Sequence, residues 1–225
     1  MRWYKTSLGK KYIMGITGLI MVGFVVAHML GNLSIFGGAG GINGYAEHLR
    51  AFPPLLWVFR GVMLVAFILH IWMGITLYLE NKSARPQQYA MKKNQRTTFS
   101  AETMIWTGAI LGVFIVYHLL HFTVHAFNPS FNKMIDRTTE TPRFDVFHMM
   151  TSSFNNFGVT IVYVAAMIVL LLHLRHGIQS FFQSLGLTND ATLPKLTTGG
   201  RWVAGVVAIG FLFTPILIFF NVIGG

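Results

Sequence analysis

Residues 12–33 read YIMGITGLIMVGFVVAHMLGNL and contain no Asp, Glu, Lys or Arg. An α-helix rises about 1.5 Å per residue, so about 20 apolar residues cross a hydrocarbon core of about 30 Å. A stretch of this length without charge therefore predicts a transmembrane helix. Its single histidine, His28, is then expected inside the membrane.

Four more stretches are similarly long and apolar, although two of them contain one arginine each, Arg60 and Arg175. The five predicted spans are residues 12–33, 55–79, 104–127, 159–182 and 202–222. The chain is 53% hydrophobic and only 11% charged, against about 25% charge in a soluble domain. We therefore expect residues 1–225 to form a single all-α integral-membrane domain whose first four helices make a bundle. Residues 144–154 (FDVFHMMTSSF) have apolar residues near helical spacing and are expected along the membrane interface.

Cysteine is absent, which excludes thiolate-held iron–sulfur clusters, thiolate zinc sites and disulfides within the chain. The net charge is +10, but the basic residues cluster in short segments between the apolar runs, so a membrane role is favoured over nucleic-acid binding. The first apolar run is too long for a cleavable signal and lacks a small-residue cleavage site.

The short loops predict the orientation, because Lys and Arg concentrate on the cytoplasmic side of membrane proteins. Eleven basic residues fall on one side: Arg2, Lys5, Lys10, Lys11, Lys82, Arg85, Lys92, Lys93, Arg96, Lys195 and Arg201. Four fall on the other: Arg50, Lys133, Arg137 and Arg143. The N-terminus is therefore expected in the cytoplasm and the C-terminus outside.

Histidines recur in the spans with fixed neighbours. TGLIMVGFVVAH (17–28) and TGAILGVFIVYH (107–118) place Thr-Gly at the same interval before His28 and His118. HIWMG (70–74) and HLRHG (173–177) each place a glycine four residues after His70 or His173. An ionisable group inside a membrane is costly and indicates function by default. A neutral imidazole bonded to a neighbouring helix explains any single histidine, but not this recurrence.

The depth of these histidines predicts two pairs. His28 and His118 lie late in outward-running spans, and His70 and His173 lie late in inward-running spans, about 15 Å away at the helical rise. Two imidazoles from facing helices at one depth are typical axial ligands of haem iron. We therefore predict two haem b groups, the outer held by His28 and His118 and the inner by His70 and His173.

Glycines and arginines extend this prediction. Gly74 and Gly177, one turn from their histidines, would leave room for a porphyrin, and Gly18 and Gly108 are expected near the inner haem. Two arginines have two alternative roles, either binding a haem propionate or extending to the interface between lipid and water. They are Arg60, expected near the outer haem, and Arg175.

Five further histidines must be placed. His121 and His125 are expected on one helix face with His118, and His176 lies one turn beyond His173. Either His121 or His176 is an alternative ligand to its neighbour, although the matching intervals favour His118 and His173. His48 and His148 fall outside the spans and are expected in solvent or at the interface.

These motifs resemble the cytochrome b membrane-anchor subunit of bacterial succinate dehydrogenases and fumarate reductases, in the five-helix, di-haem class. The resemblance rests on TGLIMVGFVVAHMLGNL, LHIWMG, TGAILGVFIVYH and LHLRHGIQSFFQSLG, and it covers the first four spans. It implies that His28 and His118 hold the outer haem and that His70 and His173 hold the inner one, as the depth argument also predicts.

The resemblance further implies a succinate:quinone oxidoreductase (respiratory complex II, an enzyme of the tricarboxylic acid cycle) in the bacterial inner membrane. A flavoprotein subunit with FAD and an iron–sulfur subunit would dock on the cytoplasmic side and hold the succinate site, and a higher oligomer of the complex is allowed. This chain would carry electrons between the iron–sulfur subunit and menaquinone. Some fumarate reductases have a proton-transferring glutamate at the position of Leu171, which puts that route in doubt here.

A quinone site does not follow from spacing. Glu47, between Tyr45 and His48, is either a proton donor to a quinone near the outer haem or a solvated loop carboxylate. Two other functions remain open: the cytochrome b subunit of a hydrogenase, formate dehydrogenase or nitrate reductase, and a haem-free transporter whose histidines relay protons or only pack.

Overall fold

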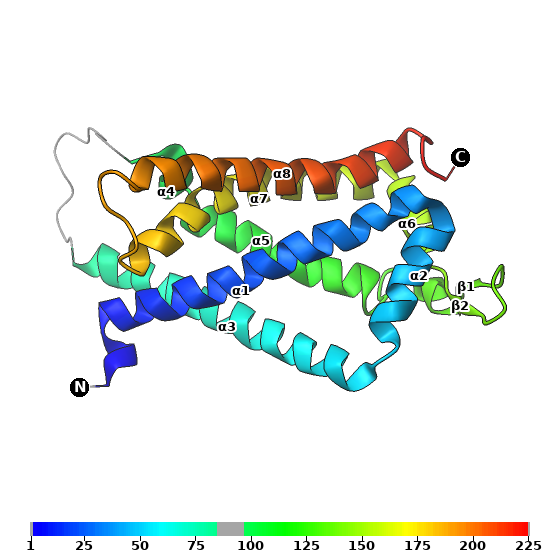
Figure 1. Ribbon diagram of the computed structural model, residues 1–225, viewed down its shortest axis with the longest axis horizontal. Helices are drawn as coiled ribbons and strands as arrows, with labels where there is room; N and C mark the ends of the chain where they lie inside the picture. Colours follow the sequence, from blue (N-terminus) through cyan, green and yellow to red (C-terminus); the bar gives the residue numbers. More distant parts are fainter. Residues whose placement is uncertain (1, 85–96, 225) are drawn as a thin grey trace.

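A computed structural model describes residues 2–84 and 97–224 (Figure 1). In this part of the chain, five helices are long and apolar enough to cross a membrane. They are α1 (Ser7–Leu33), α3 (Pro53–Ser83), α5 (Met104–Phe122), α7 (Phe157–Ser184) and α8 (Leu193–Phe219). The prediction of a helical chain with five helices able to span a membrane is confirmed.

Local capping explains where these helices begin. The side chain of Thr6 accepts a hydrogen bond from the backbone of Gly9, and that of Asn156 accepts one from Val159. Such caps satisfy N–H groups that have no partner inside a helix, so α1 and α7 start before the apolar stretches do. Helix α3 starts at Pro53, where a missing N–H costs little.

One predicted span is too long, because α5 ends at Phe122 and not near residue 127. The backbone N–H of Val124 turns back onto the last turn, and His125 takes a left-handed conformation with φ of 59°. Its Nδ1 lies 2.7 Å from Oδ1 of Asn132. The expectation that His125 shares a helix face with His118 is therefore wrong, because this tertiary contact outweighs the apolar pattern.

Four of the five long helices form a ring. Helix α1 packs on α3 and α7, and α5 packs on α7 and, over a smaller area, on α3. Helices α1 and α5 therefore face each other across the bundle, as do α3 and α7. Helix α8 lies outside this ring, along α7 and α1. Figure 1 shows α1 and α5 running in one direction and α3 and α7 in the other.

The two ends of the bundle differ. The N-terminal end carries η1 (Trp3–Lys5) and α4 (Phe99–Glu102). The opposite end carries a set of short elements that we call the cap: η2 (Ser34–Gly37), α2 (Gly38–Arg50), η3 (Pro129–Lys133), β1 (Ile135–Asp136), β2 (Arg143–Phe144) and α6 (Val146–Phe154). Strands β1 and β2 pair antiparallel, with Ile135 opposite Phe144.

Only α6 of the cap was expected from the sequence. It forms a helix within the predicted segment 144–154, and it packs against α2, α7 and α8. Its Met150 and Phe154 join a buried cluster with Ile42, Tyr163 and Ile218. Packing against α2, α7 and α8 therefore buries most of α6. These contacts with the rest of the fold, and not the membrane interface alone, determine its position.

The outer surface of the bundle is apolar. Trp57 and Trp106, each near the start of a long helix, and Trp202, in the third turn of α8, are 67%, 69% and 72% exposed. Aromatic side chains at such positions are typical of the boundary between lipid and water. Large apolar patches of this kind are unfavourable in water, so the surface matches a lipid environment.

The basic residues at the two ends of the bundle are distributed as the charges of the predicted loops indicate. Seven basic residues lie beside η1 or near the matching ends of the long helices: Arg2 and Lys5 at η1, Lys10 and Lys11 in the first turns of α1, Lys82 in the last turn of α3, and Lys195 and Arg201 in the first three turns of α8. Arg85, Lys92, Lys93 and Arg96 fall outside the described residues. Arg50, Lys133, Arg137 and Arg143 belong to the cap.

Candidate functional site

The histidines that recur in the sequence meet in pairs across the bundle. The rings of His28 on α1 and His118 on α5 have centroids 5.8 Å apart, with planes at 81°. The rings of His70 on α3 and His173 on α7 have centroids 6.4 Å apart, with planes at 64°. Each pair joins two diagonal helices of the ring, so both pairs lie toward the middle of the bundle.

The pairs lie at two levels. A Cβ added at Gly18 would be 3.2 Å from Cε1 of His70, and one at Gly108 would be 3.3 Å from Cε1 of His173. Gly18 and Gly108 are therefore level with the second pair, and each precedes its own helix's histidine by ten residues. At the helical rise this interval is about 15 Å. The pair of His28 and His118 lies on the cap side of the other.

The Thr-Gly motif supports the pair at the N-terminal end. Oγ1 of Thr107 lies 3.1 Å from Nδ1 of His173 and also bonds carbonyls of its own helix. A hydroxyl that donates to a carbonyl accepts at its lone pairs, so the Nδ1–H of His173 donates to Thr107. Nδ1 of His70 lies 3.1 Å from the carbonyl oxygen of Met14 and 3.5 Å from Oγ1 of Thr17. Both histidines are therefore held with Nε2 unprotonated.

Glycine beside these threonines lets the rings come close. A larger residue at position 18 or 108 would press on the imidazole, because contacts of 3.2–3.3 Å are already tight for a Cβ. Gly74 and Gly177 differ, since an added Cβ would meet nothing within 4 Å at either position. Each lies one turn from its histidine on the same helix, so open space adjoins His70 and His173.

Aromatic rings surround the pair at the cap end. Phe24 stacks on His28 with ring centroids 5.3 Å apart, and Phe211 of α8 lies at 5.8 Å. Phe114 and Phe122 flank His118 at 6.0 Å and 5.8 Å. These apolar rings line the space next to the two imidazoles, and the side-chain amide of Asn32 lies 3.4 Å from Nε2 of His28.

The hydroxyl of Tyr163 lies between two histidines of α5. It is 3.4 Å from Nδ1 of His118 and 3.0 Å from Nδ1 of His121. The histidine motifs do not include Tyr163, although the sequence carries a signal for it: it precedes His173 by ten residues, the interval that separates Gly18 from His28. Counting back along each span would have placed it level with His118.

The alternative ligands lie beside the pairs. The ring that faces His28 is that of His118, while His121 stacks on Phe122 at 4.1 Å. The ring that faces His70 is that of His173, with His176 one turn away on α7. His48 and His148 are exposed in the cap, in agreement with their expected place outside the spans.

Of the two arginines, Arg60 lies at the level of His28. Its neighbour Phe59 contacts Phe24, which stacks on His28, and its guanidinium lies 4.9 Å above the ring of Trp57. Arg175 is exposed on α7. Arg60 thus has the position that was predicted for a propionate partner, and stacking on Trp57 keeps it at the bundle surface.

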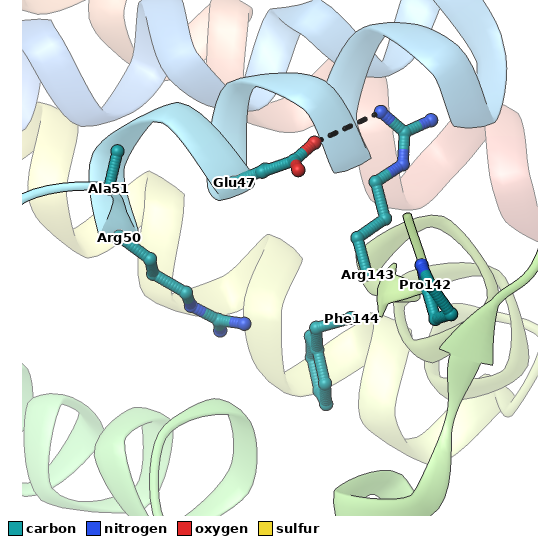
Figure 2. Close-up of a pocket in the computed structure, with 6 residues that line it drawn as sticks. All are labelled: Glu47, Arg50, Ala51, Pro142, Arg143 and Phe144. Atoms are coloured by element: carbon teal, nitrogen blue, oxygen red, sulfur yellow. Dashed lines mark ion pairs between the residues drawn. The ribbon is translucent and has the colours of Figure 1, made fainter. Parts of the chain in front are cut away.

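A pocket of about 370 Å³ opens between α2 and β2 in the cap. Figure 2 shows Glu47 directed at Arg143, with 3.6 Å between Oε2 and Nη1, and Arg50 directed at Phe144. The guanidinium of Arg50 lies 4.6 Å from the centroid of that ring. Glu47 is therefore a paired carboxylate at an open pocket, not an isolated loop residue.

A buried polar network holds the cap together. Asn43 of α2 is fully buried, and its side-chain amide donates to Oδ2 of Asp136 and to Oδ1 of Asp145, at 3.1 Å each. Its carbonyl oxygen accepts from the backbone N–H of Phe147 at 2.9 Å. This one side chain of α2 therefore binds both the β-hairpin and the start of α6, which lie about 100 residues further along the sequence.

Asp136 accepts hydrogen bonds from several donors that the fold holds in place. The hydroxyl and backbone N–H of Thr138 donate at 2.6 and 2.9 Å, and Arg143 Nε donates at 3.0 Å. These bonds from Thr138, with those from Asn43 and Arg143, hold the pKa of Asp136 well below its usual value. The carboxylate is therefore ionised at neutral pH and locks the hairpin against α2.

The residues at both levels fit a haem group. Two imidazoles on opposite faces of one metal ion, each with a metal–nitrogen bond of about 2 Å, bring their ring centroids about 6 Å apart. The observed separations are 5.8 and 6.4 Å. The open space beside Gly74 and Gly177 and the aromatic walls around His28 and His118 are of the kind that accommodates a flat, apolar macrocycle.

Comparison with known proteins yields no assignment: no family model, curated protein or solved structure matches the chain.

Proposed function

We propose that the chain is the membrane-anchoring, di-haem cytochrome b subunit of a bacterial succinate:quinone oxidoreductase, carrying electrons between an iron–sulfur subunit and menaquinone. The observation that carries this proposal is the meeting of four recurring histidines as two facing pairs, about 15 Å apart along the bundle. The motif resemblance supports the choice of this family over other membrane dehydrogenases.

Each pair would supply the two axial ligands of one haem b: His28 with His118, and His70 with His173. When bound, each haem would accept and release single electrons. At the N-terminal end the protein's own contribution is to present Nε2 of two imidazoles, by holding Nδ1 of His173 on Thr107 and Nδ1 of His70 on the Met14 carbonyl. Apolar walls keep water away, which is a main determinant of haem potential.

The orientation in the membrane is part of the proposal. The N-terminal end carries most of the described basic residues, which favours placing it in the cytoplasm. The flavoprotein and iron–sulfur subunits would dock there, next to the level of His70 and His173. The cap would then face the outside of the cell membrane, next to the level of His28 and His118.

The pocket at Glu47 is the proposed route for protons to a quinone near the outer haem. Glu47→Gln removes the ionisable group but keeps the side-chain shape, so we expect quinone reduction by the complex to slow severalfold while both haems remain. The measurement is succinate:quinone turnover together with haem content. Unchanged turnover would return Glu47 to the role of a solvated partner of Arg143.

The decisive experiment is a dithionite-reduced minus oxidised spectrum of the purified chain, with the haem content per chain. We expect two haems. Alanine replacement of His28, His70, His118 and His173, one at a time, should remove one haem each. His28 and His118 should remove the same haem, and His70 and His173 the other.

Other results would decide between the alternatives. A colourless protein would indicate a transporter or packing role for the histidines. A coloured protein that co-purifies with a hydrogenase, formate dehydrogenase or nitrate reductase catalytic subunit would keep the cytochrome and replace the succinate assignment. His121→Ala and His176→Ala test the alternative ligands, and we expect both variants to keep both haems.

A further inference from the structure

Tyr163 stands at the one point where the cap-end histidine pair meets a third histidine. Its side chain is 6% exposed, and its ring packs edge-on against Phe114 and Phe154 with centroids 5.1 and 5.0 Å away. These contacts bury Tyr163 among aromatic rings. It lies 3.4 Å from Nδ1 of His118 and 3.0 Å from Nδ1 of His121.

The direction of these two hydrogen bonds follows from the chemistry. In the proposed complex, His118 would hold the iron through Nε2, so its neutral ring would carry the proton on Nδ1 and would donate that N–H to the Tyr163 oxygen. The single hydroxyl proton of Tyr163 is then free to donate to Nδ1 of His121. This order leaves His121 protonated on Nε2, with Nδ1 occupied, so neither nitrogen of His121 is available to a metal.

We propose that Tyr163 is the positioning residue of the haem held by His28 and His118, where it orients the His118 imidazole and keeps His121 away from the iron. The inference rests on the proposed function. Hydrogen-bond partners of metal-bound histidines fix the tautomer and orientation of the ring and raise its basicity. Because donation by Tyr163 to His121 strengthens its acceptance from His118, the three side chains act as one chain of bonds.

An electronic consequence can be measured. A hydrogen bond from Nδ1–H makes the imidazole a stronger electron donor, which favours oxidised iron. Its loss should shift the reduction equilibrium of this haem toward the reduced form by about threefold to tenfold, or about 30 to 60 mV for one electron. The other haem should not respond, because Tyr163 precedes His173 by ten residues, about 15 Å along the helix.

The test is Tyr163→Phe in the full chain within its membrane complex, by redox titration of both haems and by low-spin electron paramagnetic resonance, which reports the angle between axial imidazoles. Tyr117→Phe is the matched control: its ring contacts His121 and Tyr163 at 5.6 and 5.9 Å, so it loses a hydroxyl from the same cluster. We expect a higher potential and an altered resonance signal only in Tyr163→Phe, and only for the haem that His118→Ala removes.

A second variant tests the same inference independently, in case Tyr163→Phe does not fold. His121→Leu removes the acceptor of the Tyr163 proton, and a smaller shift in the same direction is expected for the same haem. Unchanged potentials and signals in both variants, an equal shift of both haems, or an equal shift in Tyr117→Phe would overturn the inference and leave the proposed function standing. Wild-type chain without haem would instead overturn the proposed function.

Discussion

His70 and His173, at the N-terminal end, receive their support from the membrane helices themselves. Met14, Thr17 and Thr107 bond the two Nδ1 atoms, and Gly18 and Gly108 let the rings approach. His28 and His118, at the cap end, are surrounded by aromatic rings and by Tyr163, whose ring belongs to the buried cluster that the cap completes. The two pairs have matching sequence motifs, but different groups hold their rings in place.

This difference shows that equal motifs can depend on different parts of a fold. The rings of His70 and His173 are held by groups on neighbouring turns of α1 and α5. Both helices are part of the bundle itself. The cap-end pair also depends on α6 and α2, which reach it through Phe154, Met150 and Ile42. We therefore expect damage to the cap to affect one pair only.

The largest expected effect concerns Gly18 and Gly108, and it should involve only the pair of His70 and His173 at the N-terminal end. In Gly18→Leu or Gly108→Leu, the new side chain must enter the space taken by the ring of His70 or His173, because a Cβ alone already lies 3.2 or 3.3 Å from it. We expect one haem per chain in place of two, with the haem of His28 and His118 retained. Absorbance and haem analysis measure this loss.

Gly23→Leu is the control for these variants, since Gly23 is exposed on α1 and an added Cβ meets nothing within 4 Å. Both haems should remain. Retention of both haems in Gly18→Leu and Gly108→Leu would mean that the glycines do not hold the rings in place, and the comparison between the two levels would lose its basis.

A smaller effect is expected from breaking the cap. Asn43→Ala leaves two carboxylates and a backbone N–H without their buried partner, which should cost about 3 kcal/mol of stability. Thermal unfolding should begin at lower temperature, and the haem of His28 and His118 should be lost first. Asn81→Ala, at an exposed position near the end of α3 on the other side of the bundle, is the control and should change little.

A still smaller effect distinguishes the two threonines. Thr107→Val removes the hydroxyl that accepts from His173, whereas in Thr17→Val the Met14 carbonyl still accepts from His70 at 3.1 Å. We expect Thr107→Val to shift the reduction equilibrium of this haem by about threefold and Thr17→Val to shift it less. Redox titration decides, and equal shifts would argue against a threonine-specific role.

The smallest expected effect appears only on acidification and concerns Asp136. Its folded-state pKa lies below the unfolded value of about 4, so its hydrogen bonds contribute fully above pH 4 and are lost as the pH falls through the folded pKa. Stability should therefore fall on acidification below about pH 4 and less steeply in Asp136→Asn. Thermal melts of the two proteins across this range provide the test, and parallel curves would exclude Asp136.

Several features of the site could be predicted because they depend on periodicity alone. The five spans follow from apolar length, and the pairing of His28 with His118 and His70 with His173 follows from a constant rise per residue. The structure brings these rings together, while their role as haem ligands stays a prediction. The end of α5 was missed because the apolar pattern continues past Phe122 while a hydrogen bond to Asn132 turns the chain at His125.

The sequence by itself determined the membrane class of this protein, the number of long helices and the depth of its histidines, since each depends on residues within a single helix. Only the tertiary structure decided which groups hold each ring, how Tyr163 reaches His118 and His121, and how Asn43 closes the cap. These contacts join residues from 42 to 104 positions apart, and no local pattern specifies the geometry of such distant partners.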